Sequence, residues 1–166
     1  GNVFLSKTSD GAMSWNALPI SGITNADVLR LHFPDTMNGY LAFRHNPGAG
    51  LETAVWKTTD GGSNWTDVTP DSLQLGTGLG GVRFFDAQSG MLGFGSNIFI
   101  TDDGGASWTK QNNANFNEMY AFDAQGPDYW VAGGWDGTFN YTGVVQTTYD
   151  GGMSWHDHGV FQQNST

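Results

Sequence analysis

The chain has 166 residues, of which 38% are hydrophobic, 14% aromatic and 13% charged, and its formal net charge is −10. So many aromatic residues exclude an intrinsically disordered chain, and 25 glycines argue against a helical bundle. The acidic balance opposes nucleic acid and anionic lipid as partners, because like charges repel. The absence of cysteine excludes disulfides and thiolate metal sites.

In chain order, the sequence predicts short strands throughout and little or no helix. Residues 1–20 supply two strands around the motif TSDGAMSW, and three longer units follow at about 24–70, 77–113 and 115–161. Each longer unit reads as strand, turn, strand, then a third strand, a motif of the same type and a short fourth strand. Residues 1–166 are therefore expected to form one repeat domain, or the larger part of one.

The four motifs, named boxes 1 to 4, punctuate these units. They are TSDGAMSW, TTDGGSNW, TDDGGASW and TYDGGMSW, at residues 8–15, 58–65, 101–108 and 148–155. Asp can accept hydrogen bonds from backbone N–H groups in a tight loop, Gly supplies positive φ, and Trp can bury a large area against the sheet. The residues assigned this structural role are Thr8, Asp10, Trp15, Thr58, Asp60, Gly62, Trp65, Thr101, Asp103, Gly105, Trp108, Thr148, Asp150, Gly152 and Trp155.

The spacing S/T-x-D-x-G-x-x-W resembles the Asp-box, or BNR repeat, of sialidases, sortilin-type receptors, xyloglucanases and photosystem II assembly factors. The phrase VRFFDAQSGMLGFGSNIFITDDGGASW, residues 82–108, is most similar to the assembly-factor type of propeller repeat. The resemblance implies an all-β propeller of four-stranded antiparallel blades, with three complete blades plus an N-terminal half blade. Box 1 departs from the pattern by carrying Ala12 at the glycine position, which leaves its turn geometry open.

Three and a half blades are too few to close a ring without help, since propellers need about four. An open arc would expose apolar blade faces and unpaired strand edges. We therefore expect a longer parent chain, another copy or a partner to complete the ring. The alternative is a closed four-bladed ring whose first blade has two strands.

Candidate ligand-binding residues come from aligning Asp35, Asp86 and Asp123 as equivalent turn residues. Strand alternation then places several polar residues on one face of the innermost strands, beside the central channel. Such a cluster could hold an anionic or sugar-like ligand, or its members could pair with one another between blades. An aromatic loop in the last blade adds one further candidate. The full set is Arg30, His32, Arg83, Glu118, Tyr120 and Trp135.

Catalytic and metal-binding interpretations have less support. Sialidases, which the boxes resemble, use three arginines, and this chain has only Arg30, Arg44 and Arg83. Arg44 is expected on a second strand, away from the channel. His156 and His158 could face one side of the last strand, but the sequence offers no evident third metal ligand. No catalytic residue, metal or cofactor is assigned.

The sequence thus predicts a non-catalytic propeller that acts as a protein- or carbohydrate-binding or assembly module. Its low lysine content and lack of cysteine favour a place outside the cytoplasm: secreted, periplasmic, at the cell surface or in a virion. The alternatives are a fragment of a sialidase-like or other glycoside hydrolase, and a building block of a larger surface or viral assembly. Neither nucleic-acid binding nor membrane insertion is expected.

Overall fold

The computed structural model describes residues 2–46, 52–71, 73, 79–111, 116–138 and 142–161. Within them every regular element is a strand, and none forms a helix that could cross a membrane. In chain order the strands are β1 (Asn2–Lys7), β2 (Asn16–Thr24), β3 (Ala26–His32), β4 (Gly39–His45), β5 (Glu52–Thr58), β6 (Thr66–Asp67), β7 (Leu79–Phe84), β8 (Gly90–Phe94), β9 (Asn97–Thr101), β10 (Thr109–Gln111), β11 (Glu118–Ala124), β12 (Trp130–Trp135), β13 (Gly143–Thr148) and β14 (His156–Phe161).

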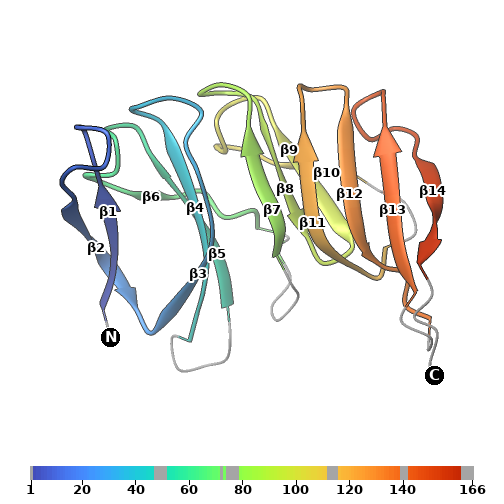
Figure 1. Ribbon diagram of the computed structural model, residues 1–166, viewed down its shortest axis with the longest axis horizontal. Coiled ribbons are helices and arrows are strands. Elements are labelled where there is room, and N and C mark those ends of the chain that lie inside the picture. The colour runs from blue at the N-terminus through green and yellow to red at the C-terminus, as the bar shows by residue number, and fades with distance from the viewer. Residues whose placement is uncertain are drawn as a thin grey trace.

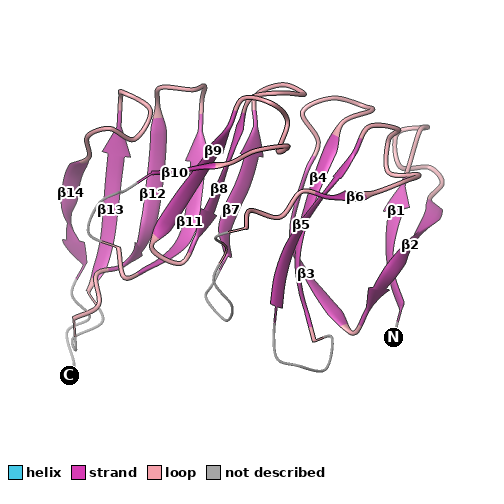
Figure 2. Ribbon diagram, turned by 180° about the vertical axis from the view of Figure 1, so that it is seen from behind, coloured by secondary structure: helices cyan, strands magenta, loops and turns pink. Residues whose placement is uncertain are grey.

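The strands form one two-stranded and three four-stranded antiparallel sheets, whose strands follow one another in chain order. Each four-stranded sheet is a blade, so the prediction of three complete blades and an N-terminal half blade is confirmed. We name the β1–β2 half blade blade 1, and the sheets β3–β6, β7–β10 and β11–β14 blades 2, 3 and 4. They stand in one row with blades 1 and 4 at its two ends (Figure 1, and from behind in Figure 2).

The hydrophobic core lies between the blades, in one cluster for each interface. Ile20 and Phe43 belong to the cluster between blades 1 and 2, and Val55 and Phe99 to the one between blades 2 and 3. The third cluster includes Met119 and joins blades 3 and 4. All residues of β8 are buried, because blade 3 is packed on both faces. Such strands read as continuous apolar runs rather than as alternating patterns.

The first strand of each complete blade carries a bulge that fixes the equivalence of the blades. Strand pairing shifts around Leu29, Gly80 and Tyr120, and β7 contacts both β3 and β11. The third residue after the bulge is His32, Arg83 or Asp123, so Asp123 corresponds to His32 and Arg83.

This register corrects the sequence alignment of Asp123 with Asp35 and Asp86. The hydrogen bond from Phe85 N to Ser89 O, 2.9 Å, has its counterpart from Gln125 N to Tyr129 O, 3.0 Å. Gly126 therefore holds the turn position of Asp86. The alignment failed because the local string FDAQ occurs in both blades, at positions that differ by three residues along the strand.

Each complete blade places one large ring under its box. In blade 2 the ring of Phe33 covers Gly39, and in blade 3 the ring of Phe84 covers Gly90. Blade 4 exchanges the two positions, because Ala124 pairs with Trp130. The space is filled in all three blades. The ring comes from the first strand in blade 3, from the residue directly after the first strand in blade 2, and from the second strand in blade 4.

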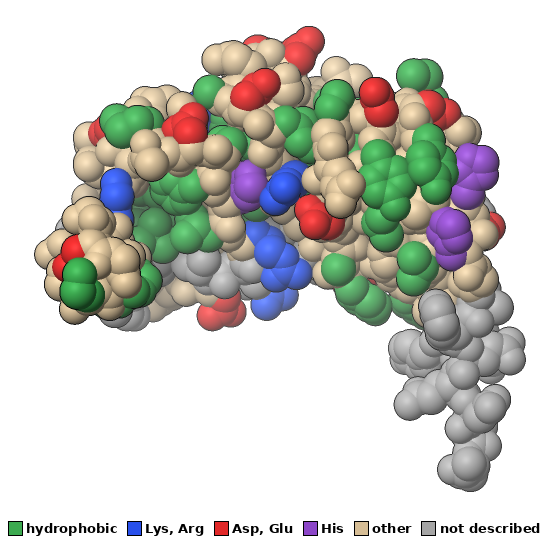
Figure 3. Space-filling model, turned by 45° about the horizontal axis from the view of Figure 1, so that its top comes forward, with side chains coloured by type: hydrophobic (Ala, Val, Ile, Leu, Met, Phe, Trp, Pro, Cys, Tyr) green, Lys and Arg blue, Asp and Glu red, His purple; other side chains and the backbone are tan. Residues whose placement is uncertain are grey.

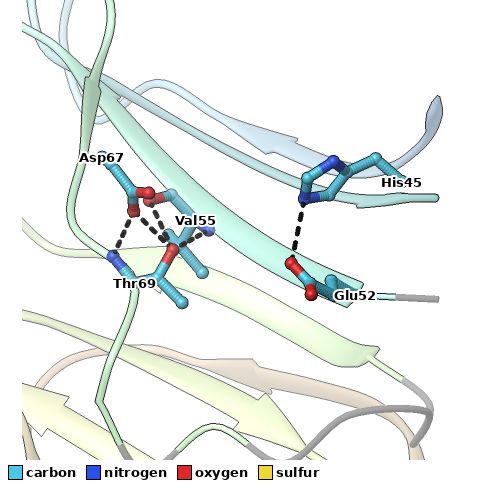
Figure 4. A network of polar contacts seen from close by, with 5 residues as sticks. All are labelled: His45, Glu52, Val55, Asp67 and Thr69. Carbon is cyan, nitrogen blue, oxygen red and sulfur yellow. Dashed lines mark hydrogen bonds and ion pairs between the residues drawn. The ribbon is translucent and has the colours of Figure 1, made fainter. Parts of the chain in front are cut away.

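Polar contacts complete the outer and lower edges of blade 2 (Figure 4). Beyond the short strand β6, Thr69 Oγ1 accepts a hydrogen bond from Val55 N at 2.9 Å, while Asp67 Oδ1 accepts one from Thr69 N at 2.9 Å. At the other end of the blade, His45 Nε2 lies 3.9 Å from Glu52 Oε2. A side chain thus replaces the backbone partner where the fourth strand ends.

Candidate functional site

The box corners share one hydrogen-bond frame, shown here for box 3. Thr101 Oγ1 donates to Asp103 Oδ1 at 2.8 Å and accepts from Gly105 N at 2.8 Å. Asp103 also accepts from Ser107 N at 2.9 Å and from Ser107 Oγ at 2.6 Å. Boxes 1, 2 and 4 repeat these bonds, with Asn64 in place of the serine in box 2. The Thr and Asp residues therefore act within their own turns.

These bonds also set the ionisation of the box carboxylates. Hydrogen bonds from Ser107 and Thr101 lower the pKa of Asp103 to about 2, since they favour the charged form. Equivalent bonds lower the pKa values of Asp10, Asp60 and Asp150 to about 2. Carboxylates held in this form at neutral pH are poor general acids.

Box 1 keeps the frame although it lacks the glycine. Ala12 adopts φ +71°, close to the +95° of Gly62, and its N–H still donates to Thr8 Oγ1 at 3.0 Å. A left-handed backbone costs a non-glycine residue about 1–2 kcal/mol. Box 1 therefore keeps the turn geometry of the glycine-containing boxes, with backbone strain at Ala12.

The box tryptophans differ in what they contact. Trp65, Trp108 and Trp155 lie with ring centroids 6.2, 6.0 and 6.2 Å from the blade rings Phe33, Phe84 and Trp130, respectively. Trp15 of box 1 is 59% exposed. Blade 1 has only the β1–β2 pair among the described strands, so it presents no such ring to Trp15.

A polar hollow lies where the three inner strands end, and we call it the channel mouth. Its volume is about 540 Å³. Basic side chains gather near the middle of the row in the view of Figure 3. The lining residues are His32, Phe33, Pro34, Arg83, Phe84, Phe85, Ala124, Gln125 and Gly126.

Contacts between blades hold the basic groups of the channel mouth. His32 Nε2 lies 2.9 Å from Phe84 O of blade 3, and Arg83 Nε lies 3.6 Å from Asp123 Oδ1 of blade 4. The buried Arg83 Nε makes no hydrogen bond among the described residues. Its separation of 3.6 Å from the Asp123 carboxylate is too long for a hydrogen bond but short enough for an ion pair. The same residues thus line the hollow and join the blades.

The other candidates lie away from the channel mouth, on β3, β11 and β12. Arg30 Nη2 approaches Tyr120 O at 3.4 Å, which joins blade 2 to blade 4. Glu118 pairs with Trp135 across β11 and β12, and Trp135 Nε1 donates to Thr138 O at 3.0 Å. These residues do not line the channel mouth. The loop that follows Trp135 includes Tyr141, which lies outside the described residues.

Sequence reasoning missed two residues at the mouth: Gln125 in its lining, and Asp123, which pairs with the lining residue Arg83. It treated Asp123 as a turn residue, whereas the structure pairs it with Arg83. Gln125 lines the hollow directly. The boxes could not supply the alignment, because Arg83 lies 20 residues before Asp103, whereas its equivalent Asp123 lies 27 residues before Asp150.

The arginines engage separate partners. Arg44 pairs with Asp27 of its own blade at 3.9 Å, while Arg83 pairs with Asp123 of the next blade. Among the described residues no three His, Asp or Glu side chains gather as a metal site would require. At the mouth, Arg83 forms an ion pair and His32 lies at hydrogen-bond distance from Phe84 O.

A row of four-stranded antiparallel blades with repeated corners defines a β-propeller.

No family model and no curated protein matches the chain. Among solved structures, by contrast, this chain has matches. It is similar to YCF48, solved bound to a D1 peptide, with 23% identity and a TM-score of 0.62 over 81% of this chain and 40% of that chain. It is also similar to the GH74 enzyme of Niastella koreensis, with 20% identity and a TM-score of 0.62 over 80% of this chain and 22% of that chain. The chain thus spans less than half the length of either structure.

Proposed function

We propose that this propeller is a non-catalytic binding module that takes a protein ligand at the channel mouth. The observation that carries the proposal is the hollow of about 540 Å³, which His32 and Arg83 line beside the carboxylate of Asp123. Guanidinium and imidazole groups with a glutamine side chain can bind carboxylates and peptide groups of a ligand. YCF48 was solved with a bound peptide, which supports a peptide over a sugar.

The test first selects ligands and then replaces basic side chains of the channel mouth. The chain is exposed to a displayed random-peptide library and to a glycan array, and peptide binders are expected. Combining Arg83→Gln with His32→Gln should weaken a selected peptide about tenfold. The matched control, Lys110→Gln, changes an exposed cation on the outer strand β10 and should have no effect. Binders that tolerate the mouth variant, or binding to glycans alone, would contradict the proposal.

The corners are proposed to be Asp-boxes of the BNR type, on the strength of their shared hydrogen-bond frame. A location outside the cytoplasm likewise remains a proposal that rests on composition. The hydrolase alternative is weaker, because Arg44 and Arg83 pair with separate carboxylates. No hydrolysis of a fluorogenic sialoside or of xyloglucan is expected.

An assembly role has its own support at the open face of blade 4. Met91 and Ile98 face blade 4 and are at most 1% exposed, whereas their equivalents Val131 and Val145 are only half-buried. We propose that a further blade, from another copy or from a longer polypeptide, covers this face. Light scattering on the chain should show self-association that Val145→Arg reduces. Persistent monomers would leave the longer polypeptide as the source.

A further inference from the structure

The interface between blades 2 and 3 contains a tyrosine that blade 2 inserts against its neighbour. Tyr40 of β4 stacks on Phe84, with ring centroids 3.3 Å apart and an interplanar angle of 4°. Its hydroxyl donates to Ala87 O at 3.2 Å and to Gly104 O at 3.4 Å. Burial raises the pKa of Tyr40, so the phenol stays protonated and remains a donor.

The interface between blades 1 and 2 has the receiving half of this arrangement. The register makes Phe33 equivalent to Phe84, and Thr36 and Gly61 are equivalent to the residues that accept the Tyr40 hydroxyl bonds. A cavity of about 370 Å³ lies beside them. Its lining is mostly apolar and includes Leu5, Leu18, Leu31 and Phe33.

Blade 1 matches the outer half of a complete blade. β1 leads into box 1 as β5 leads into box 2. The equivalent lysines Lys7 and Lys57 each donate to a carbonyl of the following blade, Lys7 Nζ to Gly61 O at 3.1 Å and Lys57 Nζ to Ala87 O at 3.4 Å. In blade 2 the inner edge of β5 pairs with β4, with Tyr40 opposite Lys57. In the described part of the chain, β1 pairs with β2 alone. The position equivalent to β4 is therefore open.

We infer that the edge of β1 and this cavity form a docking site for an extended segment of another polypeptide that carries a tyrosine. The segment adds to β1 as an antiparallel strand, with the tyrosine opposite Lys7 and a small residue opposite Thr8. The phenol ring stacks on Phe33, and its hydroxyl donates to the carbonyls of Thr36 and Gly61. Main-chain bonds supply affinity in such strand addition, and the side-chain pocket supplies specificity.

This site shares only Phe33 with the lining of the channel mouth, and its test changes neither His32 nor Arg83, so its outcome is independent of the proposed function. The geometry of the site is copied from the molecule itself. The interface between blades 2 and 3 contains Tyr40, whereas the interface between blades 1 and 2 has a cavity at the equivalent place. Leu5 and Leu31 correspond to Val55 and Val82 of the filled interface. Leu31 is 47% exposed, as expected for a residue whose covering strand is not in place.

The probe is a synthetic peptide, NGYLAFR, which copies residues 38–44 around β4. Titration into the 166-residue chain should show saturable binding, with protection of β1 amides from hydrogen exchange. The Tyr40→Phe peptide should bind about fivefold more weakly, because the ring stacks but the hydroxyl bonds are lost. The Tyr40→Ala peptide should bind about a hundredfold more weakly, because the cavity stays empty.

Matched variants of the chain locate the binding. Leu31→Arg places a charge in the cavity and should abolish binding, whereas Met37→Arg, at a residue of similar exposure (50% against 47%), should not. Equal binding of the Tyr and Ala peptides would overturn the inference, and so would protection of amides outside β1. If the unliganded chain forms dimers that Leu31→Arg separates, a second copy covers the site and the proposed peptide partner is wrong.

Discussion

Box 1 and the three later boxes contain the same hydrogen bonds but differ in how their tryptophans pack. Thr8 Oγ1 donates to Asp10 at 2.7 Å, as Thr101 does to Asp103 at 2.8 Å. Trp15 is nevertheless 59% exposed, whereas Trp108 packs on Phe84. The hydrogen-bond frame closes within eight residues and needs no neighbour. The packing needs a ring from the first two strands of a complete blade.

The largest expected effect concerns the hydrogen-bond frame that all four boxes share. Six aspartates, four in boxes and two in turns, have folded pKa values below their usual range: Asp10, Asp35, Asp60, Asp86, Asp103 and Asp150. A depressed folded pKa adds stability that is present above the unfolded value and lost as the pH falls through the folded value. The urea midpoint should therefore drop between about pH 4 and pH 2.

Single substitutions sharpen this test. Asp10→Asn and Asp103→Asn should flatten the pH profile to a similar degree, because both pKa values are lowered to about 2 by equivalent bonds. A midpoint that stays constant from pH 5 to pH 2 would contradict this account of the frame.

The second prediction concerns the packing of the box tryptophans. Trp108→Ala should cost about 3 kcal/mol of the free energy of unfolding, because it removes a ring packed on Phe84. Trp15→Ala should cost less than about 0.5 kcal/mol, as is usual for an exposed side chain. Chemical denaturation of both variants measures the difference. Equal losses would mean that Trp15 is covered in solution.

The third prediction concerns the threonine hydroxyl. Thr101 is 3% exposed, so Thr101→Val leaves the N–H of Gly105 buried without its acceptor and should cost about 2 kcal/mol. Thr8→Val should cost less, because the corresponding N–H, of Ala12, lies at an exposed corner where water can replace the hydroxyl. Urea midpoints of the two valine variants give the comparison, and a larger loss for Thr8→Val would reverse it.

The smallest expected effect is a gain. Ala12→Gly should stabilise the chain by about 0.5 kcal/mol, since relief of the left-handed strain exceeds the added entropy of glycine in the unfolded chain. Gly105→Ala, at φ +90°, should destabilise by about 1–2 kcal/mol, because its Cβ would also lie 3.3 Å from Val68. Differential scanning calorimetry can resolve both changes, and stabilisation by the alanine would show that the turn has rearranged.

The fold could be predicted because its signals are local. Each box names its own turn, and the spacing of the boxes gives the number of sheets. Box 1 adopts the same turn as the other boxes, because the hydrogen bonds of Thr8 and Asp10 outweigh the backbone strain at Ala12. The exchange of Phe84 and Gly90 for Ala124 and Trp130 could not be predicted, because either arrangement fills the same space.

The candidate site was harder to predict, because its geometry depends on register. One bulge per inner strand decides which residues are equivalent, and no residue type specifies a bulge. The sequence left open whether alternate residues of the inner strands line a channel or pair between blades. In a strand between two blades they face the preceding or the following blade, as His32 does when it contacts Phe84 O.

Two lysine joints point in the same direction along the row, while at the interface between blades 3 and 4 the equivalent position is Ile100. Lys7 of blade 1 donates to Gly61 O of blade 2, and Lys57 of blade 2 donates to Ala87 O of blade 3. A duplicated segment would carry a donor for its successor and an acceptor for its predecessor. Such polarity lets an array grow by tandem duplication in its gene without a redesigned junction.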